Sequence, residues 1–558
     1  MNAFRRVVAV ALLAGLVAGG CGAPSNQGTA LKRSDINPVP RDRVRHGGTL
    51  RWAIEQFSTQ WNANQLNGTE ASTVAVMGAM MPSPFVSDER GNLAVDRNYV
   101  SSARVTSTSP RQVVTYRLNP RARWSDGKTI TWRDYEAQWK ALRSPTGPFQ
   151  IASSTGYERI ASVKPGRDQY EVAVTFARRY GEWQGLFGLL YPAATNRDPK
   201  RFNSGWLNRI PVSAGPFKLG KIDQTAKTIT IVRDPRWWGP QAKLDSIAFR
   251  ALSSDAAINA FASGEIDVTD VGPDASHYKR VRGVPGGSVR EAAGPDFRHF
   301  TFNGTSPALS DVSVRRAIAM AINRDALVRA DLTGLNWPAR TMNNHFFVNT
   351  QTGYRDNAGQ VGRFDPAAAR RLLDQAGWRR SGAFRRKGSR VLELRFVIPS
   401  DVPTSRQEGE LSQAMLKDVG VKLDVITVPT DKFFDQYIAK GTFDIAPFSW
   451  LGTPYPISSA QSIYVKPTKD ASGHLQVQQN YARVGSPAID RLMSRAQEEL
   501  DLGRARQLIN QADRLVWDEV HSIVLYQRPQ ITAAKSNLAN IGSSGLRSTV
   551  YQDIGWAR

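Results

Sequence analysis

The stretch VVTYRLNPRARWSDGKTITWRDYEAQWKALR, residues 113–143, decides the fold. Up to Leu118 its side chains alternate between two faces, which predicts a half-buried strand. The tetrapeptide Trp124–Gly127 has the composition of a tight turn, because aspartate can bond its own backbone and glycine accepts a positive φ. Thr131 is placed to cap a helix. Apolar side chains then fall on one face of that helix, namely Tyr135, Trp139 and Leu142. By itself this stretch predicts structure and no chemistry.

The order of residues in this stretch also resembles a family signature. A strand ending in leucine is followed by the pattern W-x-D-G-x-x-x-T-x-x-D and by a helix with an aromatic residue on its buried face. This is similar to bacterial extracellular solute-binding proteins of family 5, the oligopeptide-, dipeptide- and nickel-binding lipoproteins that feed ABC importers. The plain alternative for this stretch alone is a strand, turn and helix of an ordinary α/β domain.

Further segments resemble the same family in the family's order along the chain. They are Gly47–Arg51, Asp88–Leu93, Ser213–Leu219, Arg233–Trp238, Ser263–Val268, Phe302–Asp325 and Phe364–Trp378. The resemblance implies an α/β fold of the periplasmic-binding-protein-like type II class (cluster C). In that fold two lobes and a large additional domain surround a ligand cleft and close on the ligand by a hinge.

The resemblance also implies domain boundaries. Lobe I is expected to be discontinuous, with residues 47–85, 205–296 and 515–558, while lobe II takes residues 86–204 and lobe III residues 297–514. Proline and glycine near 211–216 and 294–295 suit the crossings between lobes. Within these lobes, the apolar run 183–190 predicts a buried helix, and residues 488–516 are predicted to be helical.

The N-terminus indicates export. Arg5–Arg6 precedes an apolar run, residues 7–20, that is shorter than the roughly 20 residues of a membrane span, so residues 1–20 are predicted to be a signal peptide. Small residues precede Cys21, the only cysteine in the chain, which resembles a lipobox although Ala18 stands where leucine is usual. We expect Cys21 to carry lipid and anchor the protein to the extracytoplasmic face of the cell membrane. The alternative is a spare cysteine in an ordinary signal peptide. Residues 21–46 are polar and aperiodic, which predicts a flexible tether.

The composition suits a globular chain of several lobes with a basic surface. Of 558 residues, 41% are hydrophobic and 22% charged, and the net charge is +24. Such a charge suits an anionic partner, such as nucleic acid, anionic lipid, cell-wall polymer or an acidic ligand. The plainer interpretation is a solvated surface with a basic bias. We find no nucleic-acid motif and expect no nucleic-acid partner.

No residue pattern points to catalysis. The six histidines are scattered and form no HExxH motif, and there is no G-x-S-x-G or G-x-G-x-x-G sequence. Gly127–Thr129 is similar to the end of a P-loop, but Ala122 replaces the required first glycine. We therefore expect a monomeric binding protein that is not an enzyme and needs neither cofactor nor metal.

The ligand is the harder question. Peptide-binding relatives carry G-W-x-x-D, whose aspartate pairs with the α-amino group of the peptide. Here Trp450 is kept but Thr453 occupies the aspartate position. The resemblance implies five candidate ligand-binding residues: Trp450, Thr453, Tyr455, Trp61 and Asn64. For Trp450 the alternative is a core residue that ends a strand.

A peptide or other small molecule delivered to an ABC permease is the first prediction for function. The alternative is a cell-envelope lipoprotein of the same fold that binds or regulates lipoglycan or glycolipid assembly. Some actinobacterial lipoproteins of this fold are linked to lipoglycan assembly, and the arginine-rich composition fits such a source.

Overall fold

The computed structural model describes residues 30–469 and 472–558, so the predicted signal peptide and Cys21 lie outside the described residues. Ten strands of the described chain form one mixed sheet. In order across the sheet they are β17 (Lys422–Val428), β16 (Glu393–Pro399), β18 (Ile445–Leu451), β12 (Gly287–Phe302), β21 (Ser522–Lys535), β11 (Val268–Asp270), β1 (Thr49–Ile54), β10 (Ser246–Ala251), β9 (Thr228–Arg233) and β8 (Phe217–Asp223).

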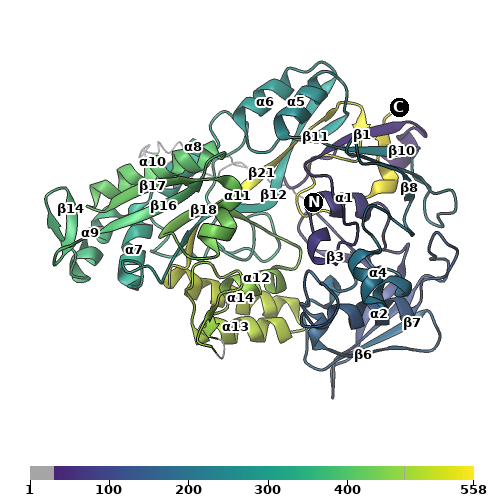
Figure 1. Ribbon diagram of the computed structural model, residues 1–558, viewed down its shortest axis with the longest axis horizontal. Coiled ribbons are helices and arrows are strands. Elements are labelled where there is room, and N and C mark those ends of the chain that lie inside the picture. Colours follow the sequence, from purple (N-terminus) through teal and green to yellow (C-terminus); the bar gives the residue numbers. More distant parts are fainter. Residues whose placement is uncertain (1–29, 470–471) are drawn as a thin grey trace, which may run out of the picture. The chain divides into compact units, whose positions relative to one another are not determined.

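The long strands β12 and β21 join the two halves of this sheet (Figure 1). They pair antiparallel, and their register shifts between Ala293 and Phe297. Gly294, Pro295 and Asp296 lie in this irregularity, where proline has no N–H to donate to the ladder. The sheet is therefore continuous but locally weakened at one of the two places where the sequence predicts a crossing between lobes. We call this irregularity the joint.

The stretch that decides the fold forms β5 (Val113–Leu118) and α2 (Trp132–Leu142), as predicted. β5 belongs to a four-stranded antiparallel sheet with β4 (Val100–Ser107), β7 (Glu171–Phe176) and β6 (Ile160–Pro165). Thr131 and Asp134 form a capping box, in which the Asp134 carboxylate accepts the Thr131 N–H at 2.9 Å. Gly127 has a φ of +91° in the preceding turn.

Buried side chains form two large cores. The first core draws mainly on residues 50–249, with residues 268 and 534–554. The second core draws mainly on residues 297–526. A neighbouring cluster between residues 346 and 516 includes side chains of α12 (Pro456–Tyr464), α13 (Pro487–Glu498) and α14 (Leu502–Asp518). We refer to the two sides of the molecule by these cores.

The other helices and short strands complete the two sides. The helices are α1 (Ala71–Gly78), α3 (Ala193–Asn196), α4 (Pro199–Ser204), α5 (Ser254–Ala262), α6 (Ala275–Arg282), α7 (Val312–Ala321), α8 (Arg324–Asp331), α9 (Pro366–Gln375), α10 (Pro403–Asp418) and α11 (Thr430–Lys432). The short strands are β2 (Phe85–Ser87), β3 (Leu93–Val95), β13 (Arg379–Ser381), β14 (Phe384–Lys387), β15 (Arg390–Val391), β19 (Thr468–Lys469), β20 (Leu475–Gln476), β22 (Leu538–Ala539) and β23 (Gly555–Trp556).

One helical prediction is wrong. Residues 183–190 form a short 3-10 turn, Trp183–Gly185, followed by irregular backbone. Phe187 and Leu189 have φ angles of +63° and +45°, which a right-handed helix excludes. The Tyr157 hydroxyl oxygen accepts the Phe187 N–H at 2.8 Å and fixes this conformation. Residues 488–516 are helical as predicted, except for a short break before Asp501, which caps α14 and separates it from α13.

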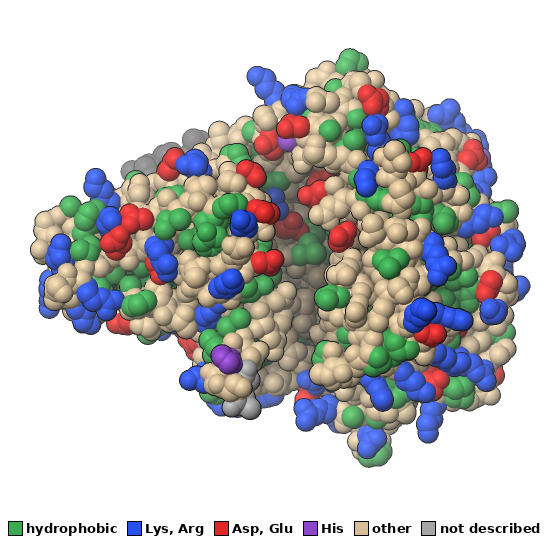
Figure 2. All heavy atoms as spheres, viewed as in Figure 1, with side chains coloured by type: hydrophobic (Ala, Val, Ile, Leu, Met, Phe, Trp, Pro, Cys, Tyr) green, Lys and Arg blue, Asp and Glu red, His purple; other side chains and the backbone are tan. Residues whose placement is uncertain are grey.

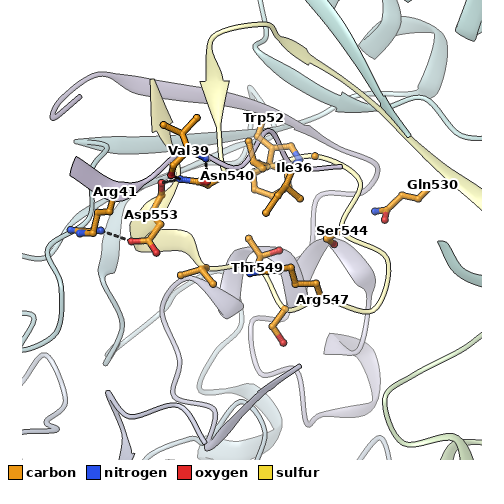
Figure 3. A pocket seen from close by; sticks show the side chains of 14 residues that line it. Ile36, Val39, Arg41, Trp52, Gln530, Asn540, Ser544, Arg547, Thr549 and Asp553 are labelled. Carbon is orange, nitrogen blue, oxygen red and sulfur yellow. Dashed lines mark hydrogen bonds and ion pairs between the residues drawn. The ribbon is translucent and has the colours of Figure 1, made fainter. Parts of the chain in front are cut away.

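The predicted tether also differs from the structure. Of residues 21–46, those from Leu31 onward pack along the C-terminal segment, and we call residues 31–46 the N-terminal strap. Leu31 and Val44 are buried, and Asp35 forms a bridge with Ser543. Figure 3 shows Ile36, Val39 and Arg41 of the strap facing Asn540, Thr549 and Asp553 around a cavity of about 200 Å³. Many of these contacts use the main chain, so side-chain periodicity did not reveal them.

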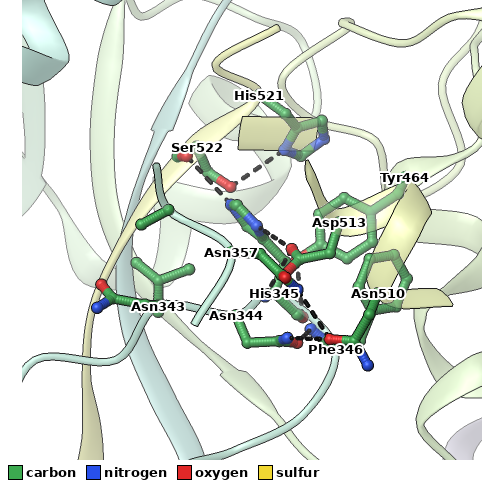
Figure 4. A network of polar contacts seen from close by, with 12 residues as sticks. Asn343, Asn344, His345, Phe346, Asn357, Tyr464, Asn510, Asp513, His521 and Ser522 are labelled. Carbon is green, nitrogen blue, oxygen red and sulfur yellow. Dashed lines mark hydrogen bonds and ion pairs between the residues drawn. The ribbon is translucent and has the colours of Figure 1, made fainter. Parts of the chain in front are cut away.

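A buried polar network fastens the loop before α9 to α14 (Figure 4). His345 Nδ1 lies 2.7 Å from Asp513 Oδ1, and its Nε2 lies 3.1 Å from the carbonyl oxygen of Ser522. Asn357 donates to the second Asp513 oxygen at 2.7 Å. The side chains of His345 and Asp513 are completely buried, so this pair stabilises the second core and is out of reach of a substrate.

Candidate ligand cleft

A hollow separates the part that carries β16 and β18 from the part that carries β3 and α1, as Figure 2 shows. Acidic side chains gather around this hollow, whereas Lys and Arg dominate the rest of the visible face. The chain as a whole carries a net charge of +24. The hollow is therefore the place on this face where a cationic group would meet opposite charge.

Trp450 belongs to a stack of three rings, which we call the aromatic wall. It lies on β18 opposite Phe297 of β12. Its ring centroid is 5.9 Å from those of His299 and Tyr481, and the ring is nearly parallel to both. Trp450 remains partly exposed, and the next residue, Leu451, is 68% exposed. A side chain fixed on both faces yet open to solvent suits the wall of an apolar binding site.

The Thr453 hydroxyl is used by the turn that precedes α12. Its oxygen accepts the N–H of Tyr455 at 3.0 Å and lies 3.2 Å from the Ser459 hydroxyl. The Thr453 carbonyl oxygen accepts a hydrogen bond from Gln351 at 2.8 Å. Thr453 thus stabilises the start of α12, and no carboxylate stands at its position.

Tyr455 lies where the two core sides touch. Its hydroxyl donates to the carbonyl oxygen of Gln184 at 3.2 Å. The carboxylate of Glu182 accepts the N–H groups of Ile457 and Ser458, at 3.0 and 2.7 Å, in the first turn of α12. Helix N-termini favour negative charge because their first N–H groups lack partners within the helix. Burial raises the pKa of Glu182, while its hydrogen bonds from Ser458 and Ile457 oppose that rise.

A second set of contacts lies beside the first. The N–H of Gly181 donates to the carbonyl oxygen of Gln497 at 2.7 Å. A Cβ atom at Gly181 would lie 2.2 Å from the carbonyl oxygen of Glu499, so only glycine permits this approach. Arg159 Nη1 lies 3.4 Å from a carboxylate oxygen of Glu498. These contacts join residues 159 and 181–184 on one side to α12, α13 and the flanking residues 455 and 499 on the other. We call this set of contacts the clasp.

Three charged side chains lie near the joint, and we call them the charged floor. Arg528 Nη1 is 3.2 Å from Asp296, which stands opposite Leu451 in the pairing of β12 with β18. Asp270, at the end of β11, is closely surrounded by protein atoms but accessible to solvent, as expected at the bottom of a concavity. Burial raises the pKa of Asp270, with a smaller contribution from repulsion by Asp296. Burial also raises the pKa of Asp296, and Arg528 opposes this.

Trp61 and Asn64 lie away from these groups. Trp61 is completely buried in the first core, where its ring meets Phe57 edge to face. The Asn64 side chain donates to the carbonyl oxygen of Leu189 at 3.3 Å. The loop that carries Trp61 packs against residues 187–191, which buries the ring, and the contact of Trp61 with ligand stays a prediction.

The sequence analysis did not single out the charged floor or Glu182. Asp296 directly follows the Gly294–Pro295 pair of a predicted crossing, and Asp270 follows the predicted helix-to-strand step by two residues. A carboxylate beside a predicted crossing, or just after a predicted strand, was the sequence signal that could have indicated these two residues. For Glu182 no local pattern exists, since its partners are 275 and 276 residues away.

Within residues 30–469 and 472–558, histidine, aspartate and glutamate nowhere gather in threes in a way that could hold a metal ion. None of the helices formed by the same residues combines the length and apolar character needed to cross a membrane.

Known proteins similar to this chain share its fold over most of its length. Periplasmic EDTA-binding protein EppA superimposes with a TM-score of 0.85 at 25% identity, covering 95% of this chain and all of that one. The oligopeptide-binding protein AppA from Bacillus subtilis, in complex with a nonapeptide, gives a TM-score of 0.73 at 16% identity over 92% of this chain. The α/β fold of the type II periplasmic-binding class is thereby confirmed.

Sequence comparison points the same way. Oligopeptide-binding protein OppA of Mycobacterium tuberculosis (strain ATCC 25618 / H37Rv) is 40% identical over 563 residues, which cover 98% of this chain and 93% of OppA. LpqW of the same strain, named as a probable monoacyl phosphatidylinositol tetramannoside-binding protein, is 29% identical over 332 residues, or 58% of this chain. Residues 102–472 match the family described as bacterial extracellular solute-binding proteins, family 5 Middle. The chain belongs to the bacterial extracellular solute-binding proteins of family 5.

Proposed function

We propose that this protein captures peptides in the hollow between its two core sides and delivers them to an ABC importer. The observation that carries the proposal is the 40% identity to oligopeptide-binding protein OppA over 98% of the chain. In this proposal the lobes are those expected from the sequence, with residues 47–85, 205–296 and 515–558 in lobe I, 86–204 in lobe II and 297–514 in lobe III. Lobe III closes over the ligand by bending at the joint.

The groups around the hollow fit a peptide. The aromatic wall and the exposed Leu451 offer apolar surface to peptide side chains. The α-amino group needs a carboxylate when it leaves water, and Thr453 offers none. Asp296 and Asp270 lie near the wall, and desolvation by the surrounding protein raises the pKa of both carboxyl groups against the opposing attraction of Arg528. We propose that they receive the peptide ammonium in place of the aspartate that relatives carry at the position of Thr453.

Calorimetry with one peptide library, free and N-acetylated, tests this assignment. A neutral hydroxyl at Thr453 by itself predicts little effect of acetylation, whereas a carboxylate at the charged floor predicts a loss of about a hundredfold, ~2.7 kcal/mol. Asp296→Asn and Asp270→Asn should reduce the difference between free and acetylated peptides, while the exposed Asp42→Asn serves as a control of equal charge change. If the aspartate variants retain the full difference, another group receives the ammonium. If no peptide binds, the proposed ligand class is wrong.

We further propose that the protein is anchored through lipid on Cys21 and faces the outside of the cell membrane. The support is the sequence Ala18-Gly19-Gly20-Cys21 after an apolar run. Intact mass and detergent partitioning should show acyl chains on the native protein, and Cys21→Ser should release it or leave it unprocessed. An unmodified Cys21 in protein purified from its natural membrane would contradict the anchor.

A second candidate function is binding of an envelope glycolipid without transport. The similarity to LpqW over 58% of the chain favours it. Native mass spectrometry of protein purified without denaturation distinguishes the two, because co-purified peptides or glycolipids differ in mass. Small-angle scattering adds a second criterion, since a transport protein should contract on binding its ligand, whereas a rigid interaction protein should not.

A further inference from the structure

A cavity of about 520 Å³ lies on the first-core side, where three loops meet. The loops are residues 121–127 after β5, residues 214–215 before β8 and residues 234–238 after β9. Its lining is dominated by two residue types, with arginines at 121, 123 and 236 and tryptophans at 124, 237 and 238. None of the residues of the aromatic wall, the charged floor or the clasp lines it.

The loops around this cavity are fixed to one another by hydrogen bonds. Arg121 donates to the carbonyl oxygen of Trp238 at 2.6 Å, and Arg236 donates to the carbonyl oxygen of Ser125 at 2.6 Å. The N–H of Ser125 donates to the carbonyl oxygen of Ser213 at 2.7 Å. Two guanidinium groups therefore reach across the seam between loops, and their orientation is set before any ligand arrives.

The cavity has a surplus of positive charge. In the described part of the chain, Arg121 and Arg123 form no ion pair, and the guanidinium hydrogen bonds of Arg121, Arg123 and Arg236 all go to carbonyl oxygens. Asp234 lies 3.9 Å from the Arg236 guanidinium and offsets the charge of that one arginine. By contrast, Arg117 on the adjoining strand β5 pairs with Asp168 at 2.7 Å. Each guanidinium has five N–H donors, so several remain for an anion.

Aromatic rings form the other part of the lining. The rings of Trp237 and Trp238 lie 4.2 Å apart, and Tyr99 packs against both. The Trp238 Nε1–H donates to the carbonyl oxygen of Asn98 at 2.7 Å, which fixes the ring, and its side chain remains partly exposed. A rigid, partly exposed indole beside unpaired guanidinium groups suits a ring that carries an anionic substituent.

We propose that this cavity is a second binding site, separate from the peptide cleft, for a phosphorylated ring compound such as a sugar phosphate or the headgroup of a phospholipid. Arg121 and Arg123 bind the phosphate oxygens, because guanidinium matches phosphate geometry with paired N–H donors. Trp238, which is the partly exposed one of the three tryptophans, contacts the ring of the ligand, and Trp237 packs against Trp238 from the protein side. The volume is large enough for a monosaccharide-sized group, since ligand pockets measure roughly 300–1,000 Å³.

The test uses the full chain and two sources of phosphate. Titration calorimetry with inorganic phosphate and with glucose 6-phosphate measures soluble ligands. Flotation with phosphatidylcholine vesicles, with or without phosphatidylinositol, measures a lipid whose phosphorylated headgroup contains a ring. The double variant Arg121→Gln with Arg123→Gln should weaken binding of whichever source binds the native protein by at least about tenfold. The control variant, Arg111→Gln with Arg117→Gln, removes the same charge outside the cavity. At an ionic strength that screens distant charges, its affinity for the phosphate probe should stay within about twofold of the native value.

The outcomes separate clearly. The site is supported by saturable binding of glucose 6-phosphate, or of vesicles containing phosphatidylinositol, that falls in the cavity variant and persists in the control variant. Which of the two probes binds identifies the source of the phosphate. Equal losses in both variants would mean that the general basic surface binds anions, which overturns the proposal. Absence of binding to every phosphate probe by the native protein overturns it as well. Melting temperatures of both variants check folding, and peptide affinity should not change in either variant.

Discussion

The second-core side is attached to the first in two different ways. At the joint, β12 and β21 carry the main chain and its hydrogen-bonded ladder across the molecule. At the clasp, Glu182 and Tyr455 make a few polar contacts with α12 and residue 184, and glycine allows the close approach at residue 181. Breaking the joint means breaking the sheet, whereas opening the clasp exchanges a small number of hydrogen bonds for bonds to water. Only the opening of the clasp is suited to a reversible step in ligand capture.

The largest expected effect is on the attachment at the joint. Arg298 of β12 and Glu408 of α10 form a buried ion pair, with 2.8 Å between Nε and Oε1. Glu408→Ala removes the carboxylate that Arg298 contacts through two nitrogens and leaves Asp331 as the remaining carboxylate near this buried charge, so we expect a loss of up to about 3–5 kcal/mol in the free energy of unfolding, measured by urea denaturation. Combining Arg298→Met with Glu408→Leu should restore most of the lost free energy of unfolding. A single variant as stable as the native protein would show that the joint does not depend on this pair.

Next in size is the steric requirement at residue 181. Gly181→Ala places a Cβ 2.2 Å from the Glu499 carbonyl oxygen, so the clasp must separate. Gly188→Ala, in the same segment, meets nothing within 4 Å and is the matched control. Energy transfer between dyes on Ser102→Cys and Arg390→Cys, in a Cys21→Ser background, should report a longer distance for the first variant alone. Overall unfolding free energy should change far less than in Glu408→Ala.

Removing the carboxylate should have an intermediate effect. Glu182→Ala leaves the N–H groups of Ile457 and Ser458 without their acceptor, which costs about 1–3 kcal/mol in the closed state. Peptide affinity should fall accordingly, by calorimetry. Glu182→Gln keeps one acceptor oxygen and should lose less. Equal affinities for the alanine variant and the native protein would mean that closure does not use the clasp.

The pH dependence of the clasp follows from the direction of the Glu182 pKa shift. Burial raises this pKa in the clasp, so the closed state binds a proton more tightly than the open state. Closure should therefore become more favourable as pH falls through the range just above the ordinary carboxyl pKa, and less favourable as pH rises through the raised value. The same dye pair measures it, and Glu182→Gln should abolish the dependence. An unchanged pH profile in Glu182→Gln would assign the effect to another group.

The smallest effect belongs to the Tyr455 hydroxyl of the clasp. Tyr455→Phe removes the 3.2 Å hydrogen bond to the Gln184 carbonyl oxygen and keeps the ring against Gly185. We expect the closed state to lose about 0.5–1.5 kcal/mol of stability, which calorimetry would show as a several-fold loss of peptide affinity at most. A loss as large as that of Glu182→Ala would show that Tyr455 contacts the ligand directly.

The sequence by itself determined the elements whose signals are local. The strand 113–118, the Thr131 cap and the Asp365–Pro366 start of α9 all depend on neighbours within a few residues, and each is where the sequence predicted it. The ordered segments that resemble the family extend from Gly47 to Trp378, because such short motifs kept their order along the chain. Local rules suffice there, since caps, turns and apolar stripes satisfy the backbone from within the segment.

Only the tertiary structure decided the features that bring distant residues together. Residues 183–190 are not helical because a hydroxyl from Tyr157 and the clasp fix their backbone, and Trp61 is buried because its loop packs on that irregular segment. The charged floor needs β11, β12 and β21 side by side, and the clasp pairs residues 275 positions apart. The physical reason is that the burial and pairing of charges depend on which strands become neighbours. The residues next to a carboxylate in the sequence do not specify those neighbours.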